Sequence, residues 1–399
     1  MIEHEVLVIG NTLSAHITAA LLARKGINVG FVRREQKRFH EIGNLWLGSP
    51  TPLIELADVL SFSARLGRIK GLFVYRDHRS YRLPISFHQM LLYSYLPLPY
   101  RFKIAINLIK LNQLDPEKVE ICTARDLLEA LNYDSYTTSY LLSVGTFATG
   151  IPWSGIDAIT FFASLFKLRK VYPEVYSIRP NIEQFMMDLT EIYDESDGIV
   201  YDAECTRISV ENDKAIAAFL DEKSVEAKFF VLSTAPYEIA GLLKELEHPV
   251  LKEYAGLRTK CLDVKIVLKE KIFGAATPLL FEEAPLFGFS PSNEGFEAGG
   301  RATTYWRYFI GNDEKSKNVE NVIRKFRVVM ARAYPNFWSN VETIEHMVVD
   351  VPLPYYKKLP QTPLRNLFIG TRNVYGNNLR DEVRAGIDAF MLCHKHLRR

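Results

Sequence analysis

The first thirty or so residues carry the clearest hydrophobic pattern of the chain. A short apolar run at residues 5–10 ends in glycine, as a buried parallel strand often does. Apolar positions then recur at helical spacing over residues 13–24, and Gly26 is well placed to end that helix. A second apolar run follows at residues 27–32. This order predicts a right-handed strand–helix–strand unit.

Similar patterns predict elements along the rest of the chain. Helices are expected at residues 51–66, 181–193, 318–334 and 379–396, and most of 86–170 is expected to be helical. Strands are expected at residues 198–208, 215–220, 228–232, 262–268, 303–309, 343–351 and 366–369, with a hairpin at 71–83. A chain that mixes helices and strands in this way is of the α/β class.

The turn after the first strand carries part of a dinucleotide-binding fingerprint. Gly10 supplies the turn-forming glycine, and Ala15 supplies the small residue where helix and strand pack closely. Thr12 stands where a second glycine lets the pyrophosphate approach the backbone, and the second strand ends in Arg33 instead of a ribose-binding acid. Arg33 suits a 2′-phosphate or a solvated surface equally well. The segment alone therefore leaves open a dinucleotide site and a helix N-terminus that faces water or another anion.

Composition narrows the class of protein. With 399 residues, 48% of them hydrophobic and a formal net charge of +2, the chain is long enough for a large core and has no global charge to attract nucleic acid. The four cysteines show no CxxC spacing and residues 1–10 lack the basic start of a signal peptide, so a cytoplasmic protein with reduced thiols is expected. The sequence also lacks an HExxH or GxSxG motif, and neither a metal site nor a serine hydrolase is expected.

Four segments, in order along the chain, carry a family resemblance. They are the run 6–15, the hairpin 75–84 with its closing Leu-Pro, the strands 200–208 and 230–236, and the C-terminal segment 366–389 with its Phe-Ile-Gly. The chain resembles the flavin-dependent amine oxidase superfamily, in particular its protoporphyrinogen oxidase and phytoene desaturase branches.

The resemblance implies an α/β fold with two discontinuous domains. A Rossmann-like FAD/NAD(P)-binding domain would comprise residues 1–75, 180–260 and 345–399, and an α+β substrate domain would comprise 76–179 and 261–344. It places ten residues at the cofactor: Gly10, Thr12, Leu13, Ala15, Arg33, Cys205, Gly370, Thr371, Asn378 and Leu379. It names no catalytic side chain, because the flavin performs the chemistry in such enzymes.

Several positions depart from the pattern of that family. Besides Thr12 and Arg33, residues 33–43 hold no Gly-Gly-Arg loop to wrap the nucleotide, and Gly370 is followed by Thr371 and not by an acidic or amide residue. Together these departures predict that the FAD site is weakened or lost.

Three hypotheses follow. The first is a protein of this fold that binds a bulky apolar ligand, such as an isoprenoid, or serves as a non-catalytic protein partner; the resemblance includes flavin-free proteins that escort prenylated proteins. The second is a working FAD-dependent oxidoreductase or desaturase of an apolar substrate. The third is a protein that meets nucleic acid or an anionic membrane through the basic residues of 65–82, although a solvated face is the commoner role of such residues.

Aromatic residues, 12% of the chain, concentrate in the expected substrate domain. Residues 90–111 and 161–170 combine aromatic and aliphatic side chains with flanking cations. Such segments form core, the wall of an apolar pocket, or at most a peripheral membrane contact.

Overall fold

The computed structural model describes most of the chain. The described residues are 3–33, 42, 45–62, 65–69, 71–84, 87–93, 96–111, 123–149, 158, 161, 175–179, 181–221, 223–270, 279–281, 284, 286–289, 301–310, 319–353, 364–371 and 379–398.

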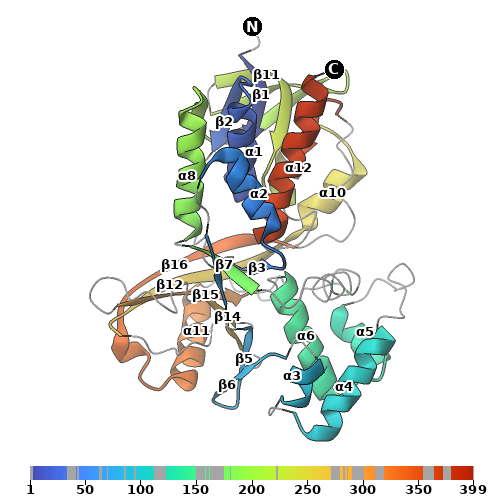
Figure 1. The fold of residues 1–399 in the computed structure, drawn as a ribbon, viewed down its shortest axis with the longest axis vertical. Coiled ribbons are helices and arrows are strands. Elements are labelled where there is room, and N and C mark those ends of the chain that lie inside the picture. The colour runs from blue at the N-terminus through green and yellow to red at the C-terminus, as the bar shows by residue number, and fades with distance from the viewer. Residues whose placement is uncertain are drawn as a thin grey trace.

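A largely parallel sheet forms the end of the molecule that holds both termini (Figure 1). Its parallel strands lie in the order β8-β2-β1-β11-β17, namely β8 (Ile199–Asp202), β2 (Val29–Arg33), β1 (His4–Ile9), β11 (Lys223–Leu232) and β17 (Leu367–Ile369). The long β11 pairs with β17 through its last residues and with the antiparallel β10 (Lys214–Leu220) through its first, and β9 (Cys205–Glu211) follows β10. The carboxyl ends of the parallel strands therefore meet at one edge, which is where α/β sheets bind ligands.

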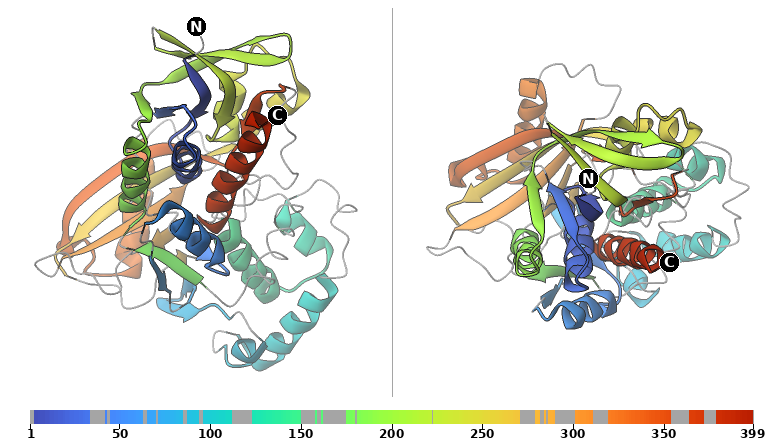
Figure 2. Two further views of the ribbon diagram at one scale, coloured as in Figure 1. Left: turned by 45° about the horizontal axis from the view of Figure 1, so that its top comes forward. Right: turned by 90° about the horizontal axis from the view of Figure 1, so that it is seen from above.

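The helix α1 (Leu13–Arg24) is enclosed on all sides. All of its residues except the last are buried, and it lies between α8 (Ile182–Asp194) and α12 (Leu379–Leu397) (Figure 2). Gly386 of α12 permits the close crossing, because a Cβ there would lie 2.8 Å from the carbonyl oxygen of Ser14. As expected, Gly26 ends α1, with a left-handed φ of 72°. The helices α2 (Thr51–Leu60), α9 (Pro236–Leu242) and α10 (Pro249–Gly256) complete this end of the molecule.

A second sheet lies below the first in Figure 1. Its strand order is β16-β12-β15-β14-β13-β5-β6, formed by β16 (Val341–Pro352), β12 (Arg258–Leu268), β15 (Ala302–Phe309), β14 (Leu286–Phe289), β13 (Leu279–Phe281), β5 (Phe73–Arg76) and β6 (Arg79–Arg82). Alternate residues of β12 and β15 face opposite ways, so one face packs on α11 (Val319–Ala333) and the other packs against α6 (Ser135–Thr149).

Helices and a small sheet complete the chain. The helices are α3 (Phe87–Leu91), α4 (Leu98–Leu111), α5 (Ala124–Ala130) and α6 (Ser135–Thr149). The small sheet, β3 (Trp46–Leu47), β7 (Val175–Arg179) and β4 (Arg65–Arg68), lies between the two large sheets in Figure 1.

The expected α/β fold class is confirmed, and two expected elements are corrected. The helix expected at 51–66 ends at Leu60, because Ser61 takes a left-handed φ of 58°, and β4 begins four residues later. The strand expected at 198–208 is two strands, β8 and β9, which are separated at Ala203 and Glu204. The division into two discontinuous domains stays a prediction.

Many aromatic residues of the expected substrate domain lie in the core. The described rings that are buried include Tyr93, Phe147, Phe161, Trp306, Tyr308 and Phe309. Trp306, for example, fills the space beside Gly288, where a Cβ would lie 2.1 Å from the indole ring. An apolar ligand for this region therefore stays a prediction.

Candidate functional site

A pocket of about 400 Å³ opens at the carboxyl ends of β1 and β2. It is lined by Ile9, Gly10, Asn11, Thr12, Val32, Ala203, Glu204, Cys205, Thr206, Thr234, Glu238, Gly241 and Leu242. Its volume is in the range of small-molecule sites. Of the ten residues expected at a cofactor, Gly10, Thr12 and Cys205 line it.

Hydrogen bonds between side-chain hydroxyl groups and backbone carbonyl oxygens fix the turn after β1. Gly10 has a φ of 140°, and a Cβ there would lie 2.1 Å from the carbonyl oxygen of Ser233, so only glycine fits. The Thr12 hydroxyl donates to that same carbonyl oxygen over 2.9 Å and lies 2.8 Å from the Ser14 hydroxyl. The hydroxyls of Ser14 and Ser233 both donate to the carbonyl oxygen of Gly370. These hydrogen bonds join the ends of β1, β11 and β17.

Thr12 also caps α1. Its Oγ1 accepts a hydrogen bond of 3.2 Å from the N–H of Ala15, so the side chain at the second fingerprint position satisfies an amide of the first helical turn. Ala15 itself is fully buried in α1, in the packing role expected of the third position.

A carboxylate from the last helix occupies the N-terminus of α1. Glu382 Oε1 accepts a hydrogen bond of 3.0 Å from the backbone N–H of Leu13, and this contact is buried. Glu382 precedes Gly386 by one helical turn, so the close crossing of α1 and α12 brings the carboxylate to this amide. The N-terminus of a helix attracts anions through its exposed N–H groups and its dipole. Here a side chain of the protein already serves as that anion.

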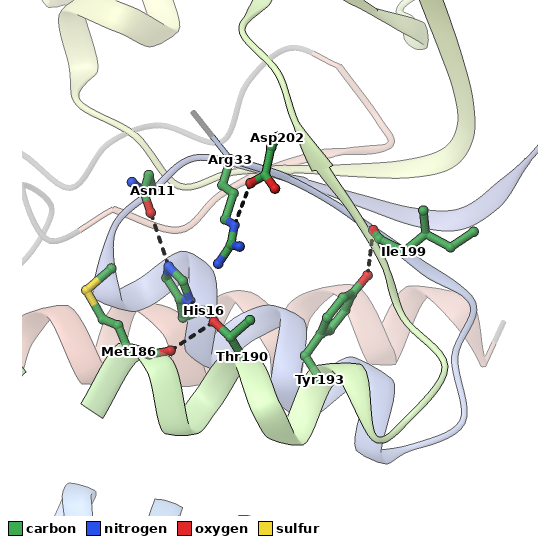
Figure 3. A network of polar contacts seen from close by, with 8 residues as sticks. All are labelled: Asn11, His16, Arg33, Met186, Thr190, Tyr193, Ile199 and Asp202. Carbon is green, nitrogen blue, oxygen red and sulfur yellow. Dashed lines mark hydrogen bonds and ion pairs between the residues drawn. The ribbon is translucent and has the colours of Figure 1, made fainter. Parts of the chain in front are cut away.

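Arg33 forms an ion pair at the edge of the sheet. Its Nε lies 2.9 Å from Asp202 Oδ1, since the two residues are register partners at the ends of β2 and β8 (Figure 3). The same view shows Asn11, whose amide oxygen lies 3.2 Å from the imidazole of His16. Arg33 is not among the residues that line the pocket.

The pocket itself is acidic. Its charged lining residues are Glu204 and Glu238, and none of the lining residues is a lysine or an arginine. The Glu238 carboxylate accepts hydrogen bonds from the N–H of Ala235, over 3.1 Å, and from the Thr234 hydroxyl. Burial raises the pKa of the Cys205 thiol to about 12, so this sulfur stays protonated at neutral pH.

The remaining expected residues lie beside the pocket or outside the described part. Gly370 and Thr371 follow β17 and are buried, and Leu379 packs in the core while its N–H donates to the carbonyl oxygen of Leu45. Asn378 lies outside the described residues.

Sequence reasoning missed Ser14, Ser233 and Glu382. Acidic residues in the first turn of the last helix were visible in the sequence, but a helix of that kind usually carries them to satisfy its own dipole. Only the crossing of α1 and α12 shows that Glu382 serves a different helix.

A buried ion pair lies on the face of the second sheet that packs against α6. Asp263 on β12 and Arg307 on β15 are register partners, and the guanidinium donates two hydrogen bonds of 2.7 Å to the carboxylate. Burial alone would lower the pKa of Arg307, but the Asp263 carboxylate raises it. Within the described ranges, the side chains form no cluster of His, Cys, Asp and Glu that could hold a metal ion, and no helix there is long and apolar enough to cross a membrane.

Comparison with solved structures gives full-length matches at low identity. An oxidoreductase from Methanosarcina mazei has a TM-score of 0.74 at 16% identity, over 97% of this chain and 99% of that one. Cyclohexylamine oxidase from Brevibacterium oxydans IH-35A has a TM-score of 0.71 at 15% identity, over the whole of both chains. Rab GDI from Plasmodium falciparum has a TM-score of 0.56 at 10% identity, over 99% and 98%. No protein-family model and no curated protein matches the sequence. At these identities the likeness shows the fold. Oxidases share this fold with Rab GDI, which is not named as an oxidase.

Proposed function

We propose that this chain, which has the fold of the flavin amine oxidases, is a flavin-free binding protein and not an oxidoreductase. The observation that carries the proposal is the buried hydrogen bond from the N–H of Leu13 to Glu382. A dinucleotide of this fold class places its pyrophosphate at that helix N-terminus. Two negative groups cannot share one amide without strong repulsion, so the residues present do not fit the pyrophosphate.

Two further features support the proposal. The N–H of Ala15 donates both to the Thr12 hydroxyl, over 3.2 Å, and to the Thr12 carbonyl oxygen, over 3.0 Å, which leaves one amide fewer for a phosphate. The open pocket offers Glu204 and Glu238 but no cation, and this charge disfavours an anionic ligand. The residues that a flavin dinucleotide would need are thus committed to contacts within the protein.

The function that remains is binding. We assign to the chain an apolar ligand of the isoprenoid class, on the support of the aromatic content of the sequence, 12% of the chain. An apolar ligand needs neither a cation nor a catalytic base, and the pocket beside Gly10 has no lysine or arginine in its lining. In the other form of this proposal, the chain is a non-catalytic partner that binds another protein.

The flavin test is an absorbance measurement on the purified protein, before and after incubation with FAD and gel filtration. We expect no flavin bands in the wild-type protein. The double variant Thr12→Gly/Glu382→Ala frees the N–H of Leu13 and removes the side chain at the second fingerprint position, so it should retain FAD. Glu245→Ala, at an exposed ion pair with Arg207, should behave like the wild-type protein. Stoichiometric FAD on the wild-type protein would refute the proposal. Circular dichroism checks that each variant is folded.

The ligand test uses farnesol as an apolar probe and follows tryptophan fluorescence. Saturable quenching by farnesol, with none by a short-chain alcohol, is the expected result. Absence of any saturable change would reject the apolar ligand but would leave the flavin-free assignment standing.

A second candidate function is a working FAD-dependent oxidoreductase. It is favoured by the full-length match to cyclohexylamine oxidase and by the pocket beside Gly10 and Cys205, at the edge where this fold class binds nucleotides. In that case the absorbance measurement gives the opposite result.

A further inference from the structure

Arg380, in the first turn of α12, carries a buried donor with no acceptor among the described residues. The atom is the Nε of its guanidinium. Buried polar groups are nearly always hydrogen-bonded, and an exception calls for a partner such as a bound ion or water. Arg307 shows the usual arrangement, since its Nε and one Nη both donate to Asp263. For Arg380, the described part of the chain supplies no such carboxylate.

A second arginine lies on the same face of α12. Arg384 follows Arg380 by four residues, so the two side chains are neighbours. Arg384 is exposed, and it too forms no ion pair with a carboxylate of the described ranges. The two acidic residues that follow Arg380, Asp381 and Glu382, are buried, and residues one or two positions apart on a helix do not face each other. The two like charges repel each other, and an anion held between them would remove the repulsion.

The start of α12 adjoins an aromatic cluster of the second sheet. The N–H of Leu379, the residue before Arg380, donates to the carbonyl oxygen of Leu45 over 3.0 Å. Leu45 is buried in the cluster that also holds Phe147 of α6 and Phe287 of β14. Figure 1 shows α12 beginning beside β3, between the parallel sheet and α6. A cationic group therefore lies at the border of a region that is rich in apolar side chains.

We propose that Arg380 and Arg384 bind an oxyanion head group, and that the apolar ligand is therefore an isoprenoid chain that ends in a phosphate or a carboxylate. A guanidinium is a planar fork of donors that matches the oxygens of either group, and the buried Nε of Arg380 would gain its acceptor. The pocket beside Gly10 has no lysine or arginine in its lining, so it cannot supply this contact. The inference rests on the apolar ligand of the proposed function, and it adds the charge and the place of the head group.

The test measures the affinities of farnesyl phosphate, farnesoic acid and farnesol for the full-length protein by quenching of tryptophan fluorescence. We expect at least one of the two anions to bind about tenfold more tightly than farnesol, with a difference that shrinks as salt is raised. Arg380→Met should remove this difference and leave the affinity for farnesol unchanged. Arg384→Met should reduce the difference without removing it, because this side chain is exposed. The matched control is Arg324→Met, at an exposed arginine of α11, which should bind all three probes like the wild-type protein.

Stability measurements separate a binding role of Arg380 from a structural one. In the absence of a probe, Arg380→Met loses no hydrogen bond to a described residue, so it should unfold at a urea concentration no lower than that of the wild-type protein. The more tightly bound anion should raise the urea midpoint of the wild-type protein but not that of Arg380→Met. A midpoint of Arg380→Met that is lowered equally with and without the anion would assign the residue a structural role and overturn the inference.

The fluorescence measurement distinguishes failure of this inference from failure of the proposed function. If farnesol binds saturably and neither anion binds more tightly, the head group is wrong and the apolar ligand of the proposed function stands. If none of the three probes binds saturably, both are wrong. Equal losses of anion affinity in Arg380→Met and Arg324→Met would also overturn the inference, because the anions would then respond only to the overall charge of the protein.

Discussion

The carboxylate of Glu382 accepts a hydrogen bond from the backbone N–H of Leu13, and the two residues are 369 positions apart in the chain. One contact thus joins the first helix to the last and places a negative charge at the positive end of α1. The contact should stabilise the fold, and under the proposed function it also fills the place where other proteins of this fold class hold a phosphate. These two consequences can be measured separately.

Substitutions of Glu382 should lower the free energy of unfolding, and the loss should be larger when both the hydrogen bond and the charge are removed than when only the charge is removed. Glu382→Ala leaves the buried N–H of Leu13 without its acceptor, which should cost about 1–3 kcal/mol of unfolding free energy. Glu382→Gln keeps an acceptor oxygen and loses only the charge, so its cost should be about 0.3–1 kcal/mol. Urea unfolding followed by circular dichroism measures both. Equal costs for the two variants would show that the charge, and not the hydrogen bond, stabilises this end of α1.

The crossing of α1 and α12 depends on a missing side chain. In Gly386→Ala, the new Cβ would lie 2.8 Å from the carbonyl oxygen of Ser14 and 2.9 Å from the Cβ of Ile17. The helices must separate, at an expected cost of about 1–3 kcal/mol.

Gly241 in α9 is the matched control for this substitution. A Cβ there meets nothing within 4 Å, so Gly241→Ala should stabilise the protein by about 0.5–1 kcal/mol through helix propensity. Opposite signs for the two variants in urea unfolding are the expected result. A neutral Gly386→Ala would mean that the two helices are not packed as closely as the structure shows.

Local patterns sufficed for most of the elements but not for the site. The strand–helix–strand unit of residues 4–33 was predictable because its apolar spacing and Gly26 are local features. Thr12 was also recognisable as an unusual residue from its position in the fingerprint. The roles of Ser233 and Glu382 were not predictable, because each depends on a contact with α1 or the turn before it across more than 200 residues. The break between β8 and β9 was missed because the apolar pattern continues through Ala203, while the chain leaves the parallel sheet there.

Removal of one partner of the buried ion pair between Asp263 and Arg307 should strongly lower the free energy of unfolding, whereas replacement of both residues by apolar ones should lower it little. Arg307→Met leaves the Asp263 carboxylate buried without its partner, which should cost about 3–5 kcal/mol. The double variant Asp263→Leu/Arg307→Met removes both charges and should recover most of that loss. The control is Arg258→Met at an exposed pair with Asp350, 3.8 Å apart, where the cost should stay below about 1 kcal/mol. Urea unfolding measures all three, and a double variant as unstable as the single one would contradict the expected coupling.

A carboxylate that caps α6 should make the stability of the helical region depend on pH. Asp134 accepts hydrogen bonds from the N–H of Thr137, over 3.0 Å, and from its hydroxyl, over 2.8 Å, and it lies 3.2 Å from Lys103 Nζ. Burial alone would raise the pKa of Asp134, but these hydrogen bonds and Lys103 outweigh it and lower the pKa. Since the pKa is lower in the folded state, the stabilisation is present above the unfolded pKa of about 3.9 and is lost as the pH falls through the folded pKa.

The comparison of two capping residues isolates this effect. Asp134→Ala should cost about 1 kcal/mol at pH 7, and the difference from the wild-type protein should shrink as the pH is lowered below about 4. Asn181 caps α8 with a neutral amide oxygen, 2.7 Å from the N–H of Gln184, so Asn181→Ala should have a similar cost that does not change with pH. Urea unfolding of the three proteins between pH 3 and pH 7 gives both differences. If the cost of Asp134→Ala stays constant over this range, ionisation of Asp134 contributes nothing to the stability of α6, and its hydrogen bonds to Thr137 act as those of a neutral cap.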